Sequence, residues 1–136
     1  SKFIMLGKGP LKEQIDKEIL QMGIQDSVIQ YDFVADINRW YSAMDALLFP
    51  SKYEGFGLVA LEAQISNLLV ISANINVQEI FVTDNIKRMV NMNVDSWSEE
   101  LNSGLKTNRN RDYLDKKVKL FSVDNQSKKI QGLILH

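Results

Sequence analysis

Short apolar runs alternate with amphipathic segments along most of the chain. Four runs are typical of buried strands and cover residues 3–6, 28–29, 46–49 and 69–71. A brief fifth strand is predicted at Met89 and Val90. Between the runs, apolar residues recur every three or four positions, which is the spacing of one face of a helix.

Turn and cap residues set the expected limits of these helices. The first helix is predicted over residues 11–22, with Pro10 at its start and Gly23 as the stop, and the second over 37–44, with Asp36 as N-cap. One face of the second helix consists of Ile37, Trp40, Tyr41 and Met44. Further helices are predicted at about 57–66, at 78–82 as a short turn, at 95–101 with Asp95 or Ser96 as cap, and from about residue 109 as one or two terminal helices.

Wholly apolar strands that alternate with helices predict an α/β fold. The expected architecture is a Rossmann-like parallel sheet with helices on both faces. Such sheets bind ligands at the carboxyl ends of their strands. Residues 7–9 and 51–57 each follow a strand, so both are expected at that edge.

Composition narrows the chemistry. The 136 residues suit a single domain, and the net charge of -1 argues against a nucleic-acid partner. The chain has no cysteine, and its one histidine is His136. No apolar run reaches the roughly 20 residues of a membrane span. Thiolate chemistry, a histidine triad and a histidine metal site are therefore not expected, and we predict neither a metal nor another cofactor.

Two carboxylates flank a glycine turn between residues 54 and 62. Gly55 and Gly57 allow the backbone to approach a ligand or to take a positive φ. Free N–H groups at the start of the next helix favour phosphate. Glu62 is expected at the margin of an apolar stripe formed by Leu58, Leu61 and Ile65, where a carboxylate needs hydrogen-bond donors such as ribose hydroxyls. The alternative is that Glu62 pairs with Lys52 and that the glycines only form a tight turn.

The segment EGFGLVALEA at residues 54–63 resembles the paired-glutamate motif of retaining glycosyltransferases of the family 4 (group 1) type. Seven residues separate the two glutamates, as in that motif. Residues 6–10, 28–34, 40–51 and 78–80 are similar to other parts of the family pattern. The resemblance covers about residues 3–95 and implies the C-terminal, donor-binding half of a GT-B enzyme.

The resemblance also implies roles for individual residues. Glu54 is the predicted catalytic residue and contacts the donor sugar, while Glu62 contacts the ribose. The remaining donor-binding predictions are Gly7 near the phosphates, Phe33 and Val34 near the base, Gly55 in the turn, and the backbone of Phe56, Gly57 and Leu58 near the sugar and diphosphate.

The same resemblance implies partners. The chain is predicted to be a truncated C-terminal part of a longer two-domain enzyme, whose N-terminal half binds the acceptor. The donor is a nucleotide diphosphate sugar, the acceptor is a saccharide that is lipid-linked in many such enzymes, and no metal is implied. The expected product is a cell-surface or capsular polysaccharide made in the cytoplasm or at the inner face of the membrane. We expect the chain alone not to catalyse transfer.

Several residues depart from the family pattern. Asp32 and Asn67 stand where glycine is common, Leu69 stands where proline is common, and residues 87–89 replace a glycine-bearing turn. These departures keep open a scaffolding or regulatory domain that has lost the chemistry. A nucleotide-sugar epimerase half also stays open, while a receiver or dehydrogenase domain lacks support because Gly7 and Gly9 have no third glycine at the dinucleotide spacing.

Overall fold

The computed structural model describes residues 1–73 and 80–106. The chain divides into two compact units, Ser1–Ile37 and Asn38–His136, and each is described by itself. The elements are β1 (Phe3–Leu6), α1 (Lys12–Gln21), the 3-10 turn η1 (Gln25–Ser27), β2 (Val28–Tyr31), α2 (Ile37–Ala43), β3 (Ala46–Phe49), α3 (Leu58–Ile65), β4 (Leu69–Ala73), β5 (Ile86–Met89) and α4 (Val94–Lys106).

The first unit is a β-α-β arrangement. Strands β1 and β2 are parallel, with Phe3 opposite Val28 and Leu6 opposite Tyr31. Helix α1 ends where predicted, because Gly23 takes a φ of 66° and its N–H bonds to the Leu20 carbonyl. The helix begins at Lys12, two residues after Pro10.

No residue of this first unit is buried, which contradicts the expected burial of residues 3–6 and 28–29. Phe3 is 49% exposed and Leu6 is 38% exposed. The physical reason is the small size of the unit, since two strands and one helix cannot cover both faces of a sheet.

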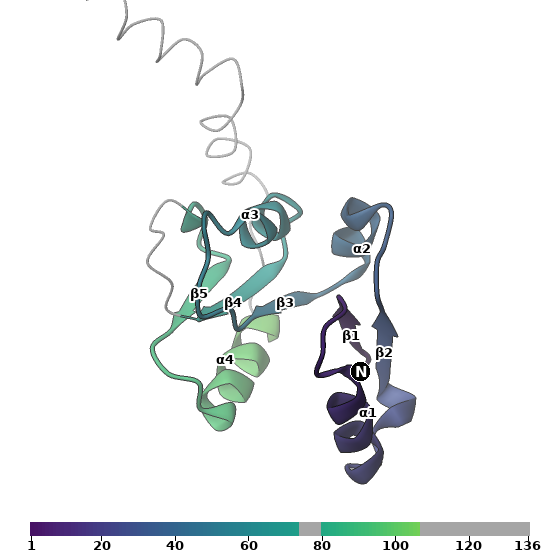
Figure 1. Ribbon diagram of the computed structural model, residues 1–136. Helices are drawn as coiled ribbons and strands as arrows, with labels where there is room; N and C mark the ends of the chain where they lie inside the picture. Colours follow the sequence, from purple (N-terminus) through teal and green to yellow (C-terminus); the bar gives the residue numbers. More distant parts are fainter. Residues whose placement is uncertain (74–79, 107–136) are drawn as a thin grey trace, which may run out of the picture. The chain divides into compact units, whose positions relative to one another are not determined.

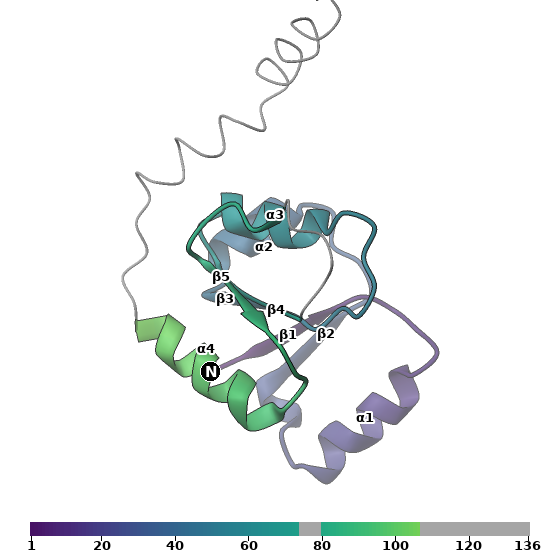
Figure 2. The same cartoon turned by 90° about the vertical axis from the view of Figure 1, so that its left-hand side faces the viewer.

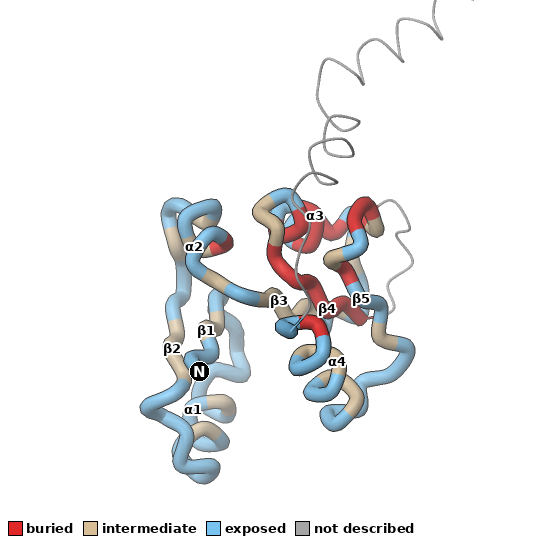
Figure 3. Tube along the Cα trace, turned by 180° about the vertical axis from the view of Figure 1, so that it is seen from behind, coloured by how far each residue is buried: buried red, intermediate tan, exposed pale blue. Residues whose placement is uncertain are grey.

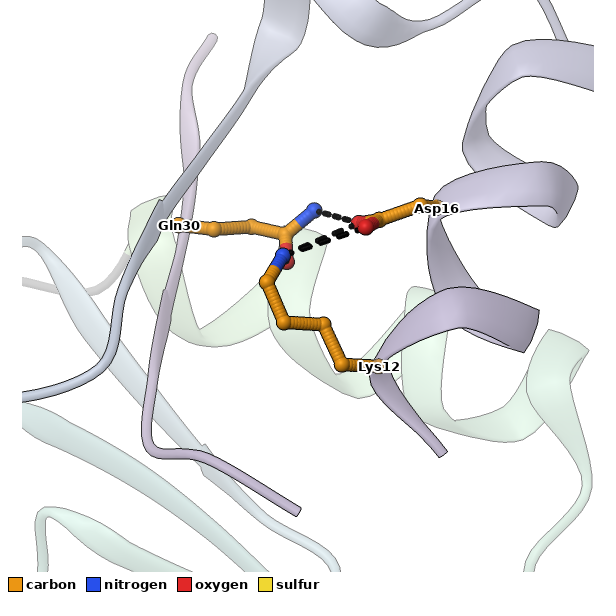
Figure 4. A network of polar contacts seen from close by, with 3 residues as sticks. All are labelled: Lys12, Asp16 and Gln30. Atoms are coloured by element: carbon orange, nitrogen blue, oxygen red, sulfur yellow. Dashed lines mark hydrogen bonds and ion pairs between the residues drawn. The ribbon is translucent and has the colours of Figure 1, made fainter. Parts of the chain in front are cut away.

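Polar side chains join α1 to β2 in the first unit. The Lys12 ammonium lies 3.1 Å from a carboxylate oxygen of Asp16 and 3.1 Å from the Gln30 side-chain oxygen, and the Gln30 amide donates to Asp16 at 2.8 Å (Figure 4). The Gln30 hydrogen bond, followed by Lys12, lowers the pKa of the Asp16 carboxyl. Because the ion pair is about half exposed, it adds little stability by itself.

The second unit contains a three-stranded parallel sheet in the order β3, β4, β5. Strand β4 is central, and all five of its residues are buried. Helices α3 and α4 cover opposite faces of this sheet (Figures 1 and 2). A central parallel strand needs apolar side chains on both faces, so the apolar run at residues 69–71 is explained.

The core lies between α3, β4 and the segment that precedes β5, where the buried positions gather (Figure 3). Ala60 and Ala63 are fully buried, and their small side chains allow α3 to lie close to the sheet. Leu68, Val70, Ile71 and Ile80 fill the remaining space at 0–1% exposure. Burial of each such large side chain contributes about 1.5–3 kcal/mol.

A fully buried glutamine, Gln64, ties α3 to the segment before β5. Its amide nitrogen donates to the Ile80 carbonyl at 2.7 Å and to the Ala60 carbonyl at 2.9 Å. Its oxygen accepts hydrogen bonds from the Thr83 N–H at 3.2 Å and the Thr83 hydroxyl at 3.0 Å. A buried amide is tolerated only when its donors and acceptors are satisfied, and these four bonds satisfy Gln64.

Two predicted limits in the second unit are wrong. The fifth strand covers Ile86–Met89 and excludes Val90. Helix α4 extends to Lys106 and is capped by Asn93, whose side-chain oxygen accepts from the Ser96 N–H at 3.0 Å. A glycine inside a helix is unfavourable, so the sequence gives no sign that α4 continues through Gly104. In the structure Gly104 is buried beside Leu69, and a Cβ at this position would lie 2.6 Å from a leucine methyl.

The expected face of α2 is confirmed, since Tyr41 is buried and Ile37, Trp40 and Met44 are half-buried. Residues 80–82 of the predicted turn at 78–82 are described, and the Val82 N–H bonds to the Ile80 carbonyl at 3.0 Å. Residues 78 and 79 and all of the terminal helices from residue 109 lie outside the described residues. No helix within residues 1–73 and 80–106 has both the length and the apolar character needed to cross a bilayer.

Replacement of Gln64 by methionine tests the buried network. We expect Gln64→Met to lower the free energy of unfolding by about 3 kcal/mol, because the Ile80 carbonyl and both Thr83 donors lose a buried partner. Urea denaturation measures this loss. Gln21→Met, at an exposed position on α1, is the control and should change stability by less than about 0.5 kcal/mol. Equal effects of the two changes would show that the network contributes nothing.

The Asp16 cluster predicts a dependence of stability on acid pH. A carboxyl whose pKa is lowered by folding stabilises the protein above its unfolded value of 3.8, and this stabilisation is lost as pH falls through the folded pKa. Gln30→Leu removes the largest cause, so we expect the pKa of Asp16 to rise toward 3.8 and the acid-induced loss of stability to shrink. A carboxyl-carbon NMR titration measures the pKa. An unchanged Asp16 pKa in the variant would contradict the assignment.

Candidate functional site

Three predicted donor-binding residues follow the strands of the first unit. Gly7 comes directly after β1, and Phe33 and Val34 come shortly after β2. Because the strands are parallel with Leu6 opposite Tyr31, these residues lie at the carboxyl edge of their sheet. Gly7 has a φ of 135°, which strongly favours glycine, and its N–H bonds to the Tyr31 carbonyl at 2.9 Å. Phe33 is 82% exposed and Val34 is half-buried, so the phenyl ring of Phe33 is open to solvent.

The glycine loop of the second unit connects the carboxyl end of β3 to the start of α3. Gly57 is the N-cap residue of α3 and takes the left-handed conformation, with φ 80° and ψ 41°. Its carbonyl accepts the N–H groups of Ala60 and Leu61 at 3.1 and 3.2 Å. The sharp entry into the helix therefore depends on Gly57, which confirms the predicted positive φ at this position.

Gly55 behaves differently from Gly57. Its φ lies outside the left-handed range, and a Cβ built on it would meet nothing within 4 Å. Protein packing thus does not require a glycine at position 55. Glu54 is half-buried and forms no hydrogen bond or ion pair with another described residue, while Phe56 and Leu58 are 41% and 60% exposed. This loop therefore presents a carboxylate and the free N–H groups of a helix start to solvent.

Of the predicted apolar stripe of α3, only Leu61 is buried, so the predicted face is wrong. The expectation that the Glu62 carboxylate is desolvated at its margin is wrong as well. The buried face consists of Ala60, Leu61, Ala63 and Gln64. Leu58 and Ile65 are 60% and 41% exposed, and Glu62 is exposed. The helix is rotated because it presents small alanines and a hydrogen-bonded glutamine to the sheet, in place of its larger apolar residues.

Glu62 has a hydrogen-bond partner on α2. The Tyr41 hydroxyl lies 3.4 Å from Glu62 Oε2 and donates to it, whereas Lys52 forms no ion pair with Glu62. Burial, followed by the negative charge of Glu62, raises the pKa of the Tyr41 phenol to about 12. The phenol is therefore protonated at neutral pH and remains a donor to the carboxylate.

The carboxyl end of α3 is fixed by a left-handed asparagine. Asn67 has a φ of 61°, its N–H bonds to the Gln64 carbonyl at 2.9 Å, and the Leu68 N–H bonds to the Ala63 carbonyl at 2.9 Å. These bonds form a Schellman motif, in which glycine is the usual residue and asparagine the next best. The departure from glycine at position 67 is thus explained by the backbone and does not indicate a degenerate site. The Asn85 amide also donates to the Asn67 side-chain oxygen at 2.8 Å.

Two other departures have structural explanations. Leu69, at the start of β4, is 3% exposed and packs against Gly104. Residues 87–89, which stand where the family pattern has a glycine-bearing turn, belong to β5. Arg88 pairs with Ser72 in the strand ladder and lies 4.0 Å from the centre of the Phe81 ring. Nothing in the structure explains Asp32.

A separate apolar hollow lies on the α4 side of the second unit. It is lined by Leu48, Met92, Val94, Trp97, Ser98 and Leu101. It contains no charged side chain, and none of the predicted site residues lines it. The hollow therefore lacks the charged groups that would recognise a diphosphate.

Sequence reasoning missed Gln64 and Asn67, which hold α3, and treated Tyr41 only as a core residue. The sequence carries a weak signal for each: an amide on the buried face of a helix, an asparagine just past the helix end, and a tyrosine among apolar neighbours.

Comparison with known proteins identifies the family. Residues 1–121 match the model of the family described as "Glycosyl transferases group 1", and the chain belongs to this family. Its parallel strands flanked by helices form the Rossmann-like α/β fold of GT-B glycosyltransferases, so the predicted fold class is confirmed.

Three known proteins illustrate the similarity. The D-inositol 3-phosphate glycosyltransferase of Segniliparus rotundus is 32% identical over 96 residues, which are 69% of this chain and 21% of that protein. The Vi polysaccharide biosynthesis protein VipC/TviE of Salmonella typhi is 31% identical over 72 residues, or 53% of this chain and 12% of the relative. The structure of the pneumococcal O-GlcNAc transferase GtfA, solved with UDP and GlcNAc, matches with a TM-score of 0.71 and 20% sequence identity. The match covers 99% of this chain and 30% of the GtfA chain. The matches thus span only a minor part of each relative.

Substitutions at Asn67 test how the end of α3 is held. We expect Asn67→Ala to lower the free energy of unfolding by about 1–2 kcal/mol, because a positive φ is strained with a Cβ and without a local side-chain hydrogen bond. Asn67→Gly should cost less, since it keeps the backbone conformation and loses only the side-chain bonds. Thermal or urea unfolding measures both changes. Equal losses would show that the backbone conformation does not matter here.

Proposed function

We propose that this chain is the donor-binding part of a retaining glycosyltransferase. The observation that carries the proposal is the glycine loop between β3 and α3, which presents Glu54 and the helix start to solvent. Glu62 follows on the exposed side of the same helix. Membership of the group 1 family supports this interpretation.

Each proposed contact follows from the chemistry of the donor. A nucleotide diphosphate sugar carries two negatively charged phosphates, a ribose with two hydroxyls, and a sugar. Backbone N–H groups near Phe56, Gly57 and Leu58 suit the diphosphate, since the first N–H groups of a helix lack partners within the helix. The Glu62 carboxylate suits the paired ribose hydroxyls, and Glu54 suits the hydroxyls of the transferred sugar.

The first unit supplies the remaining proposed contacts. Phe33 and Val34 bind the base through their backbone, and the chain passes close to phosphate at Gly7. In support, Gly7 has a positive φ and no described atom lies within 4 Å of where its Cβ would be. Gly55 likewise has open space around its Cα, which suits close approach by a ligand.

The proposed reaction transfers the sugar to an acceptor hydroxyl. The bond between the anomeric carbon and the diphosphate oxygen breaks, a bond from that carbon to the acceptor oxygen forms, and the proton of the acceptor hydroxyl passes to the leaving diphosphate oxygen. The nucleoside diphosphate leaves, and the anomeric configuration is retained. Stabilisation of the diphosphate charge by helix N–H groups and basic side chains is the proposed role of the protein, without a metal.

The acceptor and its binding domain are also proposals. The curated relatives are much longer than this chain, which leaves room for an N-terminal domain that binds the acceptor. The name of the Salmonella relative refers to polysaccharide biosynthesis. We therefore propose a saccharide acceptor, in lipid-linked form, and a cell-surface polysaccharide as the product. The proposed place of action is the cytoplasm or the inner face of the membrane.

Binding of nucleotide sugars by the chain, with and without Glu62, tests the proposal. Ligand-observed NMR with UDP-, GDP- and ADP-sugars identifies the base, and titration calorimetry gives the affinity. We expect Glu62→Ala to weaken binding at least about tenfold, because hydrogen bonds to a charged group are strong.

Glu99→Ala is the matched control, because Glu99 is an exposed helical glutamate on α4 and its loss changes the net charge equally. It should alter affinity by less than about twofold. Equal losses in the two variants would contradict the role of Glu62. Failure of the wild-type chain to bind any of the nucleotide sugars would contradict donor binding by this chain.

A further inference from the structure

The contact between α2 and α3 joins a buried group to an exposed one. Tyr41 is 2% exposed, whereas Glu62 lies on the exposed side of α3. A buried tyrosine hydroxyl normally requires a hydrogen-bond partner, and Glu62 Oε2 is that partner. The hydroxyl of the buried Tyr41 therefore links the core of the second unit to the exposed Glu62 carboxylate.

This contact restricts a side chain that would otherwise rotate freely. An exposed glutamate on a helix samples many rotamers, and ordering it upon ligand binding has a substantial entropic cost. The Tyr41 ring cannot follow such motion, because it is packed beneath the surface. A hydroxyl fixed near Oε2 favours the rotamers of Glu62 that keep this oxygen close to α2.

The contact also occupies only part of the hydrogen-bonding capacity of the Glu62 carboxylate. An ionised carboxylate has two oxygens and about four acceptor sites, of which the tyrosine occupies one. Oε1 and the remaining acceptor sites are left for other donors. Two neighbouring ribose hydroxyls need two acceptor sites in a fixed orientation, and a carboxylate held by one oxygen provides them.

We infer that Tyr41 is a positioning residue for the donor site, and that its hydroxyl orients the Glu62 carboxylate to receive the two ribose hydroxyls. This inference rests on the proposed function and adds a residue to it. The Tyr41–Glu62 separation of 3.4 Å is longer than the usual 2.7–2.8 Å, and such bonds commonly shorten when a ligand binds.

A plain packing role for Tyr41 is the competing explanation, and Tyr41→Phe separates the two. Phenylalanine keeps the ring in the core and removes only the hydroxyl. A packing role predicts that the variant binds every nucleotide as the wild type does. A positioning role predicts that only ligands with ribose hydroxyls are affected.

The ligand experiment compares a ribonucleotide with its 2′,3′-dideoxy form. The nucleotide is whichever of UDP, GDP and ADP the wild-type chain binds most tightly. We expect the wild type to prefer the ribose form at least about tenfold. Tyr41→Phe should reduce this preference at least about threefold, while its affinity for the dideoxy form stays within about twofold and its unfolding midpoint stays near that of the wild type.

A ligand-free measurement tests the pair itself. NMR of tyrosine ring carbons should show one phenol with a pKa of about 12, and this signal should be missing in Tyr41→Phe. Glu62→Gln should lower that pKa, since a negative charge is removed, but leave it above 10.0 because burial is the larger cause. An unchanged pKa in Glu62→Gln would overturn the inference without involving any ligand.

The outcomes distinguish failure of the inference from failure of the proposed function. If the wild type prefers ribose and Tyr41→Phe keeps the full preference, the positioning role is wrong and the donor site stands. If the wild type binds no nucleotide, or binds without a ribose preference, the proposed role of Glu62 is wrong, and the inference falls with it.

Discussion

The buried amide of Gln64 is the interaction on which the second unit depends. It bonds to the carbonyl of Ile80 and to both donors of Thr83, so it links α3 to the segment that enters β5. Small alanines on either side allow α3 to lie close enough for these bonds to form. In a low-dielectric interior such bonds are directional, and they set the rotation of α3 more sharply than apolar contact does.

This rotation has a functional consequence. With Gln64 and the alanines facing the sheet, Glu62 faces outward and the larger residues Leu58 and Ile65 are exposed. The proposed ligand-binding carboxylate is thus exposed because of what the opposite face of the helix buries. The two left-handed residues, Gly57 and Asn67, fix where this helix begins and ends. The local backbone and the buried network together determine the position of Glu62.

The two units differ in how firmly their own contacts hold them. The second has a central buried strand with a helix on each face, while the first has no buried residue and relies on polar contacts such as that of Gln30. Phe33 and Val34, proposed to bind the base, and Gly7, proposed to lie near phosphate, belong to the first unit. The residues proposed to bind the diphosphate, the ribose and the sugar belong to the second. The proposed donor-binding residues are thus found in both units, one built around a packed core and one without it.

Local pattern in the sequence determined the order of strands and helices, the stop of α1 at Gly23, the tight turn at Gly57 and the buried strand at residues 69–71. These features depend on neighbouring residues or on runs of one character, which a sequence displays directly. Tertiary structure alone decided which face of α3 is buried, that α4 continues through Gly104, and that Tyr41 meets Glu62. The reason is physical: each of these depends on partners 16 or more positions away, such as Ile80 for Gln64 and Glu62 for Tyr41, and no local pattern records them.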